Sequence, residues 1–299
     1  REGSRGLGDV YKRQAVTDVF EPGSIIKPFT LAAILESGLA NPDTLVDTAP
    51  GKFEVGGHVI HDISNYGEID VTRIITKSSN VGMAKLALAQ DGQHLWNMLS
   101  RFGLGEVTGL GFPGESPGVL RRYQRWRPLE QATLSYGYGL SVTPLQMAQA
   151  YGAIADNGRL HQPRLVLGSE PLIESVLDPA LAGTLSGMLE TVTGPDGTAK
   201  NANLPLFRVA GKTGTSRKVG AGGYHDRYVS SFAGYAPVAN PRLICVVMVN
   251  DPSGEDYYGG LVAAPVFSAV MKGALRLLNV PPDDLNVLMA QAQAEGDAS

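Results

Sequence analysis

Apolar positions recur at helical spacing along the first two thirds of the chain. Segment 143–157 shows the pattern most plainly, because its apolar stripe begins after Pro144 and ends at Gly158, which suit a first helical turn and a helix end. Asp178 before Pro179 predicts the start of another helix. The pattern as a whole predicts helices over residues 24–37, 93–102, 143–157 and 178–193, and further helices that start near residues 71 and 81.

The last third of the chain changes to short apolar runs separated by turns rich in Gly and Asp. These runs cover residues 208–215, 229–235 and 242–250, and a final helix is predicted at 264–278. Strands that follow one another through short turns pair as an antiparallel sheet. We therefore expect an α+β fold (an α/β sandwich), in which helices flank an antiparallel sheet beside a mostly helical subdomain.

Composition and charge narrow the possible functions. The chain has 299 residues, of which 43% are apolar, enough for one large domain or two small ones. A formal net charge of −4 argues against the basic surface that nucleic-acid binding favours, so we predict no nucleic-acid partner. The single cysteine, Cys245, excludes an internal disulfide and a cysteine-based zinc site. His58 and His61 have no clustered third ligand, so we predict no metal and no other cofactor.

Ser24 and Lys27 are three residues apart in a predicted helix, which places the hydroxyl and the amine on one face. The preceding Pro22-Gly23 puts Ser24 at the helix N-terminus, where free N–H groups and the positive dipole end face a reacting carbonyl. A serine nucleophile needs an adjacent base, and a lysine serves only when its pKa is lowered. The pair fits a nucleophile and its base, but taken alone it is more typical of an ordinary helix cap.

The second motif is Ser78-Ser79-Asn80, which lies in a short connection between predicted helices. Ser78 is suited to relay a proton between Lys27 and a second lysine. Asn80 is suited to hold the peptide amide of a substrate. Serine and asparagine are also common in caps and turns, so this motif alone decides nothing.

The third motif is Lys212-Thr213-Gly214-Thr215, in a predicted strand. Alternation along the strand points Thr213 and Thr215 to one side, where their hydroxyls can bind a carboxylate beside the charge of Lys212. Gly214 lets a substrate backbone lie close to the strand. The N–H group of Thr215 is expected to join that of Ser24 in an oxyanion hole.

The order and context of the three motifs carry more weight than any one of them. Together they resemble the active-site motifs of penicillin-binding proteins. Sequences similar to those of class B penicillin-binding proteins occur at residues 20–28, 77–82, 135–143, 210–215 and 258–267. The resemblance covers residues 15–284 and is greatest to the division-specific (septal) peptidoglycan D,D-transpeptidases of Gram-negative bacteria, of which the chain would be a catalytic-domain fragment.

The resemblance implies a penicillin-binding transpeptidase fold, like that of serine β-lactamases, and a serine acyl transfer. Ser24 would attack the penultimate D-Ala carbonyl of a peptidoglycan stem peptide and release the last D-Ala. An amine on a neighbouring stem would then take the acyl group, which forms a cross-link in the septal cell wall. β-Lactam antibiotics would acylate the same serine. Lys212, Thr213 and Thr215 would hold the terminal carboxylate, and Tyr257 and Tyr258 would form an aromatic wall near the pocket.

The chain boundaries carry expectations of their own. Residues 9–14 resemble the translated end of a transposon used to prepare sequencing libraries, so residues 1–14 are predicted to be a disordered artefact. The transpeptidase domain is predicted over residues 15–284, and residues 285–299 as a disordered tail. Compared with the family, the membrane anchor, a non-catalytic module and the first helix and strands of the catalytic domain are absent. We therefore expect an N-terminally truncated domain with an open sheet edge and low stability.

The full-length protein would lie on the periplasmic face of the bacterial inner membrane. Its absent regions would contact a septal glycosyltransferase and other divisome proteins. Three alternatives compete with transpeptidation. A β-lactamase would need a deacylating loop, which residues 130–134 do not match. A D,D-carboxypeptidase would use water as the acceptor, and a β-lactam sensor would be acylated without turnover; the flanking segments favour the transpeptidase.

Overall fold

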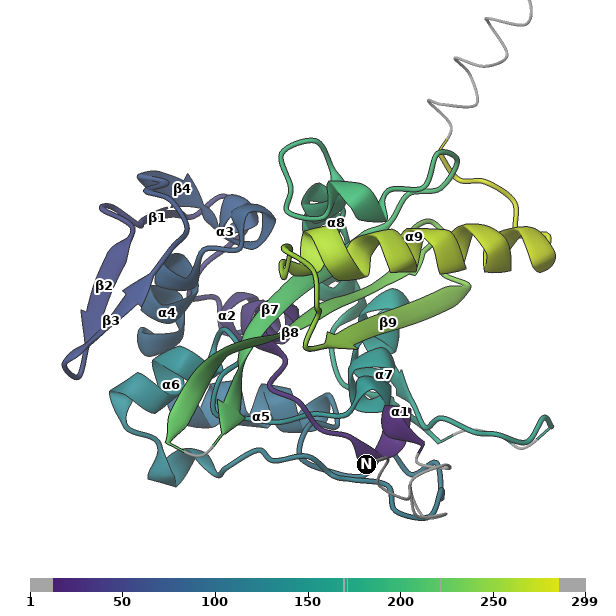
Figure 1. Ribbon diagram of the computed structural model, residues 1–299, viewed down its shortest axis with the longest axis horizontal. Coiled ribbons are helices and arrows are strands. Elements are labelled where there is room, and N and C mark those ends of the chain that lie inside the picture. The colour runs from purple at the N-terminus through teal and green to yellow at the C-terminus, as the bar shows by residue number, and fades with distance from the viewer. Residues whose placement is uncertain (1–12, 169, 171, 221, 285–299) are drawn as a thin grey trace, which may run out of the picture.

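The structure is a computed structural model that describes residues 13–168, 170, 172–220 and 222–284 (Figure 1). The predicted artefact and the predicted disordered tail therefore lie outside the described residues, apart from residues 13 and 14. Gln14 opens the short helix α1 (Gln14–Thr17).

A three-stranded antiparallel sheet forms the centre of the molecule, in the order β7-β8-β9. Its strands are β7 (Ala210–Gly220), β8 (Gly223–Ala236) and β9 (Leu243–Asn250). Thr213 lies opposite Phe232, and Phe232 lies opposite Val247. The structure thus confirms the predicted antiparallel sheet. The hairpin of β7 and β8 is longer than predicted, because its exposed end is polar and lacks the apolar alternation on which the prediction depended.

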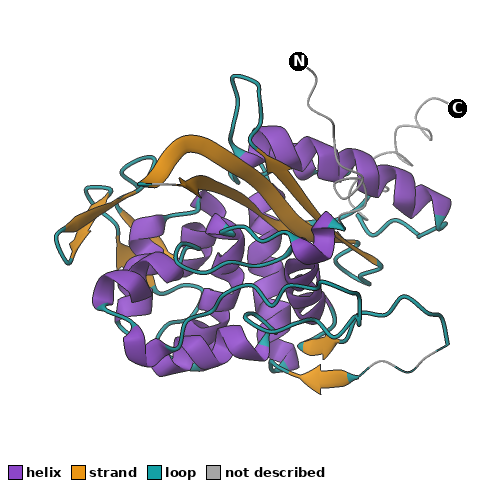
Figure 2. Cartoon of the chain, turned by 60° about the horizontal axis from the view of Figure 1, so that its bottom comes forward, coloured by secondary structure: helices purple, strands orange, loops and turns teal. Residues whose placement is uncertain are grey.

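Helices cover both faces of this sheet, as the two views show (Figures 1 and 2). Helix α9 (Gly259–Leu277) packs on one face, where the rings of Phe267 and Phe232 lie 4.6 Å apart. Helices α7 (Pro144–Ala155) and α8 (Pro179–Thr193) pack on the other. Asp178 caps α8 as predicted, since its carboxylate accepts the N–H groups of Ala180 and Leu181.

Helix α9 begins five residues earlier than predicted and has the length and apolar composition of a membrane span. The sequence pattern predicted a shorter helix here, over residues 264–278. One face of the helix carries buried residues, among them Ala263, Phe267 and Met271, which pack against the sheet. We therefore describe α9 as a layer of the α/β sandwich.

Helix α2 (Lys27–Glu36) runs through the centre of the helical part and is buried on all sides along most of its length, as expected of a core helix. The ring of Phe29 lies 4.8 Å from that of Phe102 and 5.4 Å from that of Tyr151. Helix α2 packs against α4 (Asn80–Leu88), α5 (Gly92–Arg101) and α8, while α3 (Val71–Lys77) and α6 (Pro128–Leu134) pack against α4.

The described residues also form three small two-stranded sheets. They pair β1 (Leu45–Asp47) with β4 (Glu68–Asp70), β2 (Lys52–Val55) with β3 (His58–His61), and β5 (Arg159–His161) with β6 (Ile173–Ser175). Short 3-10 turns form η2 (Gly23–Ile26), η3 (Tyr123–Arg125) and η4 (Lys200–Ala202). The sequence pattern missed α6, which begins directly after the Gly- and Pro-rich connection and is only seven residues long.

Candidate active site

Ser24 lies in the 3-10 turn η2, and Lys27 begins helix α2 directly after it. The helix was predicted to begin at Ser24, and the structure shows that its first turn is a 3-10 turn. Gly23 has a φ of +54° and donates its N–H to the carbonyl of Gly137 over 3.1 Å. The hydroxyl of Ser216 on β7 donates to the carbonyl of Glu21 over 2.7 Å. These bonds fix the nucleophile segment between the turn at Gly137 and strand β7.

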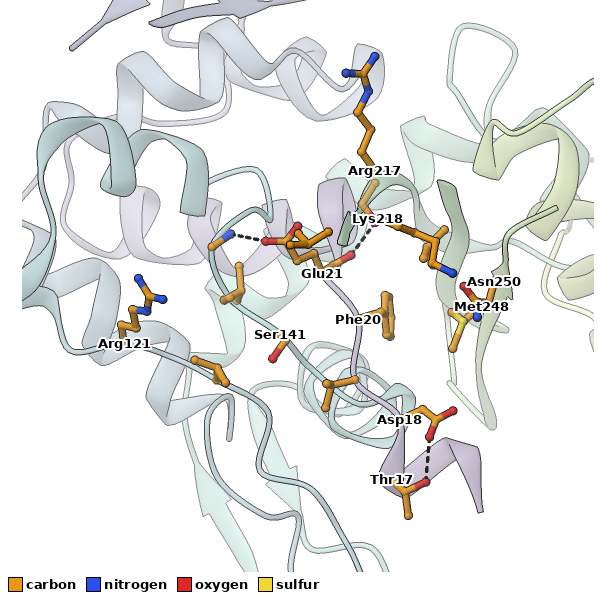
Figure 3. Close-up of a pocket in the computed structure, with 17 residues that line it drawn as sticks. Thr17, Asp18, Phe20, Glu21, Arg121, Ser141, Arg217, Lys218, Met248 and Asn250 are labelled. Atoms are coloured by element: carbon orange, nitrogen blue, oxygen red, sulfur yellow. Dashed lines mark hydrogen bonds between the residues drawn. The ribbon is translucent and has the colours of Figure 1, made fainter. Parts of the chain in front are cut away.

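The side chain of Glu21 adds a third fixing contact, within a cavity of about 650 Å³ beside the segment (Figure 3). Its carboxylate accepts the N–H of Gly139 over 2.8 Å and the hydroxyl of Tyr224 over 3.1 Å. Burial raises the pKa of Glu21 above its usual value, and these two hydrogen bonds oppose the rise. Glu21 thus ties the approach to Ser24 to the tip of the β7–β8 hairpin.

Lys27 is fully buried, and its amine is directed into the turn between α3 and α4. Nζ donates to the carbonyl of Ser78 over 2.7 Å, to that of Ser79 over 3.2 Å and to Oδ1 of Asn80 over 2.8 Å. It also lies 3.2 Å from Oγ of Ser78. Among the described residues Ser24 is not a hydrogen-bond partner of this amine, so the two are related by their three-residue spacing alone.

Ser78 joins the two lysines of the predicted site. Its Oγ lies 3.2 Å from Nζ of Lys27 and 2.9 Å from Nζ of Lys212. The backbone of Ser78 is in the left-handed region, with φ 60° and ψ 37°, at the end of α3. This conformation costs a residue with a Cβ about 1 kcal/mol. The fold therefore keeps a strained residue at the point where the two amines meet.

Burial lowers the pKa of both lysines of the site. Burial lowers the pKa of Lys27 to about 7, and the nearby carboxylate of Asp62 opposes this shift. Burial, and then the charge of Lys27, lower the pKa of Lys212 below its usual value. A neutral Lys27 is able to accept a proton, which is the property that the sequence motif requires of it.

Asp62 is a residue of this site that the sequence did not indicate. It follows β3 and is only partly exposed. Its carboxylate accepts hydrogen bonds from the hydroxyl of Ser79 over 2.6 Å and from the N–H groups of Asn80 over 2.5 Å and Val81 over 3.0 Å. Nothing in the local sequence signals these contacts, because the tertiary fold brings its partners, which lie 17 to 19 residues further along the chain.

The strand of the third motif separates its side chains as predicted. Thr213 and Thr215 line the cavity that contains Ser24, whereas Lys212 is fully buried beneath it. The hydroxyl of Thr213 lies 2.8 Å from that of Thr198, and the hydroxyl of Thr215 accepts the N–H of Gly259 over 3.0 Å. Lys212 therefore reaches the cavity through Ser78. Thr198, on the loop after α8, is a second residue that the sequence did not indicate.

Gly214 has a packing reason in addition to the one expected. A Cβ at this position would lie 2.8 Å from the carbonyl oxygen of Pro22 and 3.1 Å from the side chain of Ile25. The glycine thus allows the nucleophile segment to approach β7. Its predicted contact with a substrate backbone stays a prediction.

Tyr257 and Tyr258 lie at the cavity, just before α9. The two rings stack with centroids 4.6 Å apart, and the ring of Tyr257 also stacks on that of Tyr228 at 4.0 Å. Both rings line the cavity, and their predicted role as an aromatic wall for the substrate stays a prediction. Tyr228 on β8 extends this stack beyond the two predicted residues.

These residues surround one open cavity of about 900 Å³. Its walls come from η2, the segment after β3, the start of α4, strand β7 and the start of α9, so segments far apart in the sequence meet here. The lining includes Ser24, Asp62, Ser78, Asn80, Thr198, Thr213, Thr215, Tyr257 and Tyr258. Over the described residues, no three His, Cys, Asp or Glu side chains gather as metal ligands would.

Comparison with known proteins gives the site a context. Residues 2–272 match the family described as "Penicillin binding protein transpeptidase domain". The chain is 42% identical to the peptidoglycan D,D-transpeptidase FtsI of Escherichia coli K12 over 280 residues, which are 93% of this chain and 47% of that protein. It is 40% identical to the probable peptidoglycan D,D-transpeptidase PbpC of Pseudomonas aeruginosa over 277 residues, which are 92% of this chain and 49% of that protein.

A solved structure shares the fold. The apo transpeptidase (TP) domain of Burkholderia pseudomallei penicillin-binding protein 3 superposes with a TM-score of 0.86 at 44% identity, over 91% of this chain and 83% of that chain. The chain spans about half the length of the curated relatives it matches.

Proposed function

The chain belongs to the penicillin-binding protein transpeptidase family, and from this we propose that it is a serine D,D-transpeptidase that cross-links peptidoglycan stem peptides. The observation that carries the proposal is the position of Ser78. Its hydroxyl lies between the buried amines of Lys27 and Lys212, at the wall of the cavity that contains Ser24. This arrangement suits an acyl transfer that moves a proton twice.

In the first half of the reaction, Oγ of Ser24 forms a bond to the penultimate D-Ala carbonyl and gives its proton to neutral Lys27. The C–N bond to the last D-Ala then breaks. The hydroxyl of Ser78 gives a proton to the leaving amine and regains one from Lys27, which lies 3.2 Å away. The serine ends as an ester, Lys27 is neutral again, and free D-Ala leaves.

In the second half, an amine of a neighbouring stem peptide attacks the ester carbonyl. The new amide bond forms, the bond to Ser24 breaks, and the proton of the amine returns to Oγ through the same groups. We assign the N–H groups of Ser24 and Thr215 to the oxyanion, and each such donor is worth ~3 kcal/mol of barrier. We assign the hydroxyls of Thr213 and Thr215 to the substrate carboxylate, with Lys212 supplying positive charge behind them.

The larger setting is also part of the proposal. Similarity to proteins named FtsI supports a role in cell division at the septum. The stem-peptide substrate places the reaction on the periplasmic side of the inner membrane. A septal glycosyltransferase and other divisome proteins are the proposed partners, and β-lactam antibiotics are the proposed inhibitors that acylate Ser24.

A product assay tests the proposal. Purified chain is incubated with a pentapeptide stem ending in D-Ala-D-Ala and a stem that carries an acceptor amine. We expect release of D-Ala and a cross-linked dimer from the wild-type chain, and neither from Ser24→Ala. Release of D-Ala without the dimer would instead indicate a carboxypeptidase. Acylation by penicillin without D-Ala release would indicate a sensor, and equal products from both proteins would contradict the role of Ser24.

A further inference from the structure

The carboxylate of Asp62 takes no part in the steps above, yet it contacts the second motif at three points. Oδ2 accepts the hydroxyl of Ser79, and Oδ1 accepts the N–H groups of Asn80 and Val81. Both N–H groups belong to the first turn of α4, whose donors have no partner within the helix. A carboxylate at this position accepts hydrogen bonds from them and is also attracted to the positive end of the helix dipole.

The same turn holds Lys27. Oδ1 of Asn80 and the carbonyl of Ser79 accept hydrogen bonds from Nζ of Lys27, over 2.8 Å and 3.2 Å. The amide nitrogen of Asn80 is itself held by the carbonyl of His61, the residue before Asp62, over 3.2 Å. A single short segment after β3 thus fixes both Ser79 and Asn80, the residues that orient the amine.

We propose that Asp62 is a positioning residue for the acyl transfer, which holds Ser79 and Asn80 so that their oxygen atoms orient Nζ of Lys27 toward its proton partners. The inference rests on the proposed function, since it concerns the base of that reaction. It assigns to Asp62 an action through its neighbours, without contact to the substrate.

The charge of Asp62 also acts on the pKa of Lys27, which a purely structural role would not require. The charged group that shifts the pKa of Lys27 is Asp62, and the charge of Lys27 in turn lowers the pKa of Lys212 on β7, which lies on the other side of Ser78. On other elements, Tyr66 adjoins Asp62, and His94 on α5 contacts the carbonyl of Ala33, which is more than a turn along α2. Because the Asp62 carboxylate raises the pKa of Lys27 against the effect of burial, removing its charge lowers that pKa.

The test is the pH dependence of acylation by a fluorescent penicillin in Asp62→Asn, measured as the second-order rate constant between pH 5.5 and 9. Asparagine keeps an acceptor for the N–H groups of α4 but loses the charge and the acceptor for Ser79. We expect the midpoint of the profile to move to lower pH by about half a unit or more. We also expect the plateau rate to fall about tenfold, because the base is weaker and less well oriented.

The matched control is Asp70→Asn. Asp70 caps α3, where its carboxylate accepts the N–H of Arg73 over 2.6 Å, and it is not among the groups that shift the pKa of Lys27. The control should lower the unfolding temperature and leave the midpoint unchanged. An Asp62→Asn midpoint equal to that of the wild type would overturn the proposal, whatever its unfolding temperature.

Asp62→Glu is the test to use if Asp62→Asn is acylated too slowly for its pH profile to be measured. Glutamate restores the charge, so faster acylation than in Asp62→Asn supports the proposal, and no gain over Asp62→Asn overturns it. Failure of the proposed function is visible separately, because the wild-type chain would then not be acylated, or Ser24→Ala would be acylated equally.

Discussion

At the scale of single residues, the hydroxyl of Ser78 connects two amines whose pKa values are lowered by burial. Its left-handed backbone places Oγ between Lys27 and Lys212, and no neighbouring side chain on the same turn reaches both. Residue 78 therefore needs both a left-handed backbone and a hydroxyl that can relay a proton. Two substitutions separate these two needs.

Ser78→Gly keeps the left-handed conformation, and Ser78→Ala does not favour it. Because both remove the proton relay, we expect the acylation rate to fall about 100-fold or more in each. In chemical denaturation the glycine variant should be more stable than the alanine variant by about 1 kcal/mol. Near-normal acylation in Ser78→Gly would contradict the relay.

Lys27 sets the pH dependence of the wild-type chain. The protonated amine cannot accept the proton of Ser24, so the rate follows the neutral fraction. With the pKa of Lys27 lowered to about 7, acylation should rise from pH 6 to pH 8 and level off above. Stopped-flow labelling measures the profile. A rate that is constant over this range, or that falls as pH rises, would count against Lys27 as the base.

The sequence predicted which residues form the site better than it predicted the contacts between them. Ser24, Lys27 and Ser78 belong to local motifs, so the identity of the motif residues followed from spacing. The contacts of Asp62 did not, because its partners come from another element through the tertiary fold. The burial of Lys212 was also missed, since alternation in a strand tells which residues share a side but not which side is covered.

At the scale of elements, the nucleophile turn η2 depends on a close backbone approach between Gly137 and Gly23. A Cβ on Gly137, whose φ is +98°, would overlap the carbonyl of Gly23. Gly139 has a φ of +84° but nothing within 4 Å of an added Cβ. Both glycines thus have a positive φ, but only Gly137 is also required to be glycine by close packing.

Gly137→Ala should therefore displace η2 and lose most acylation, with a loss of stability of about 3 kcal/mol from strain and overlap. Gly139→Ala should cost only about 1 kcal/mol, from the left-handed backbone, and keep its activity. Chemical denaturation and penicillin labelling of both variants check this. Equal effects in the two variants would show that the approach of Gly137 to Gly23 does not hold the turn.

Element boundaries were predicted best where a cap or a proline marks them. Pro144 and Asp178 gave the starts of α7 and α8 correctly, because each sits at a position with a specific backbone requirement. Helix α9 begins earlier than predicted, at Gly259, because its first turn is packed by contacts with β7 and the site instead of by an apolar stripe.

At the scale of the whole molecule, β9 is one of the two outer strands of the central sheet over the described residues, and β7, which carries the third motif, is the other. The side chains of β9 are mostly apolar and half-buried, and Ile244 is 41% exposed. An apolar outer strand with free backbone groups pairs readily with another strand. The open sheet edge and the low stability expected from the sequence stay predictions.

We expect the chain to self-associate as its concentration rises, and Ile244→Lys to reduce this, because a lysine on an outer strand disfavours pairing. Val270→Lys, on the exposed side of α9, is the control, since Val270 is 51% exposed but not on the sheet edge. Sedimentation velocity over a range of concentrations distinguishes them. Equal reduction by both variants would point to general solubility in place of the edge.

The account as a whole depends on a covalent bond to Ser24. Its most direct test is mass spectrometry of the chain after incubation with benzylpenicillin, followed by peptide mapping, beside Ser24→Ala. We predict one adduct with the mass of the intact antibiotic on the peptide that contains Ser24, and none in the variant. An adduct at another residue, equal labelling of the variant, or no adduct on the folded wild-type chain would contradict the account.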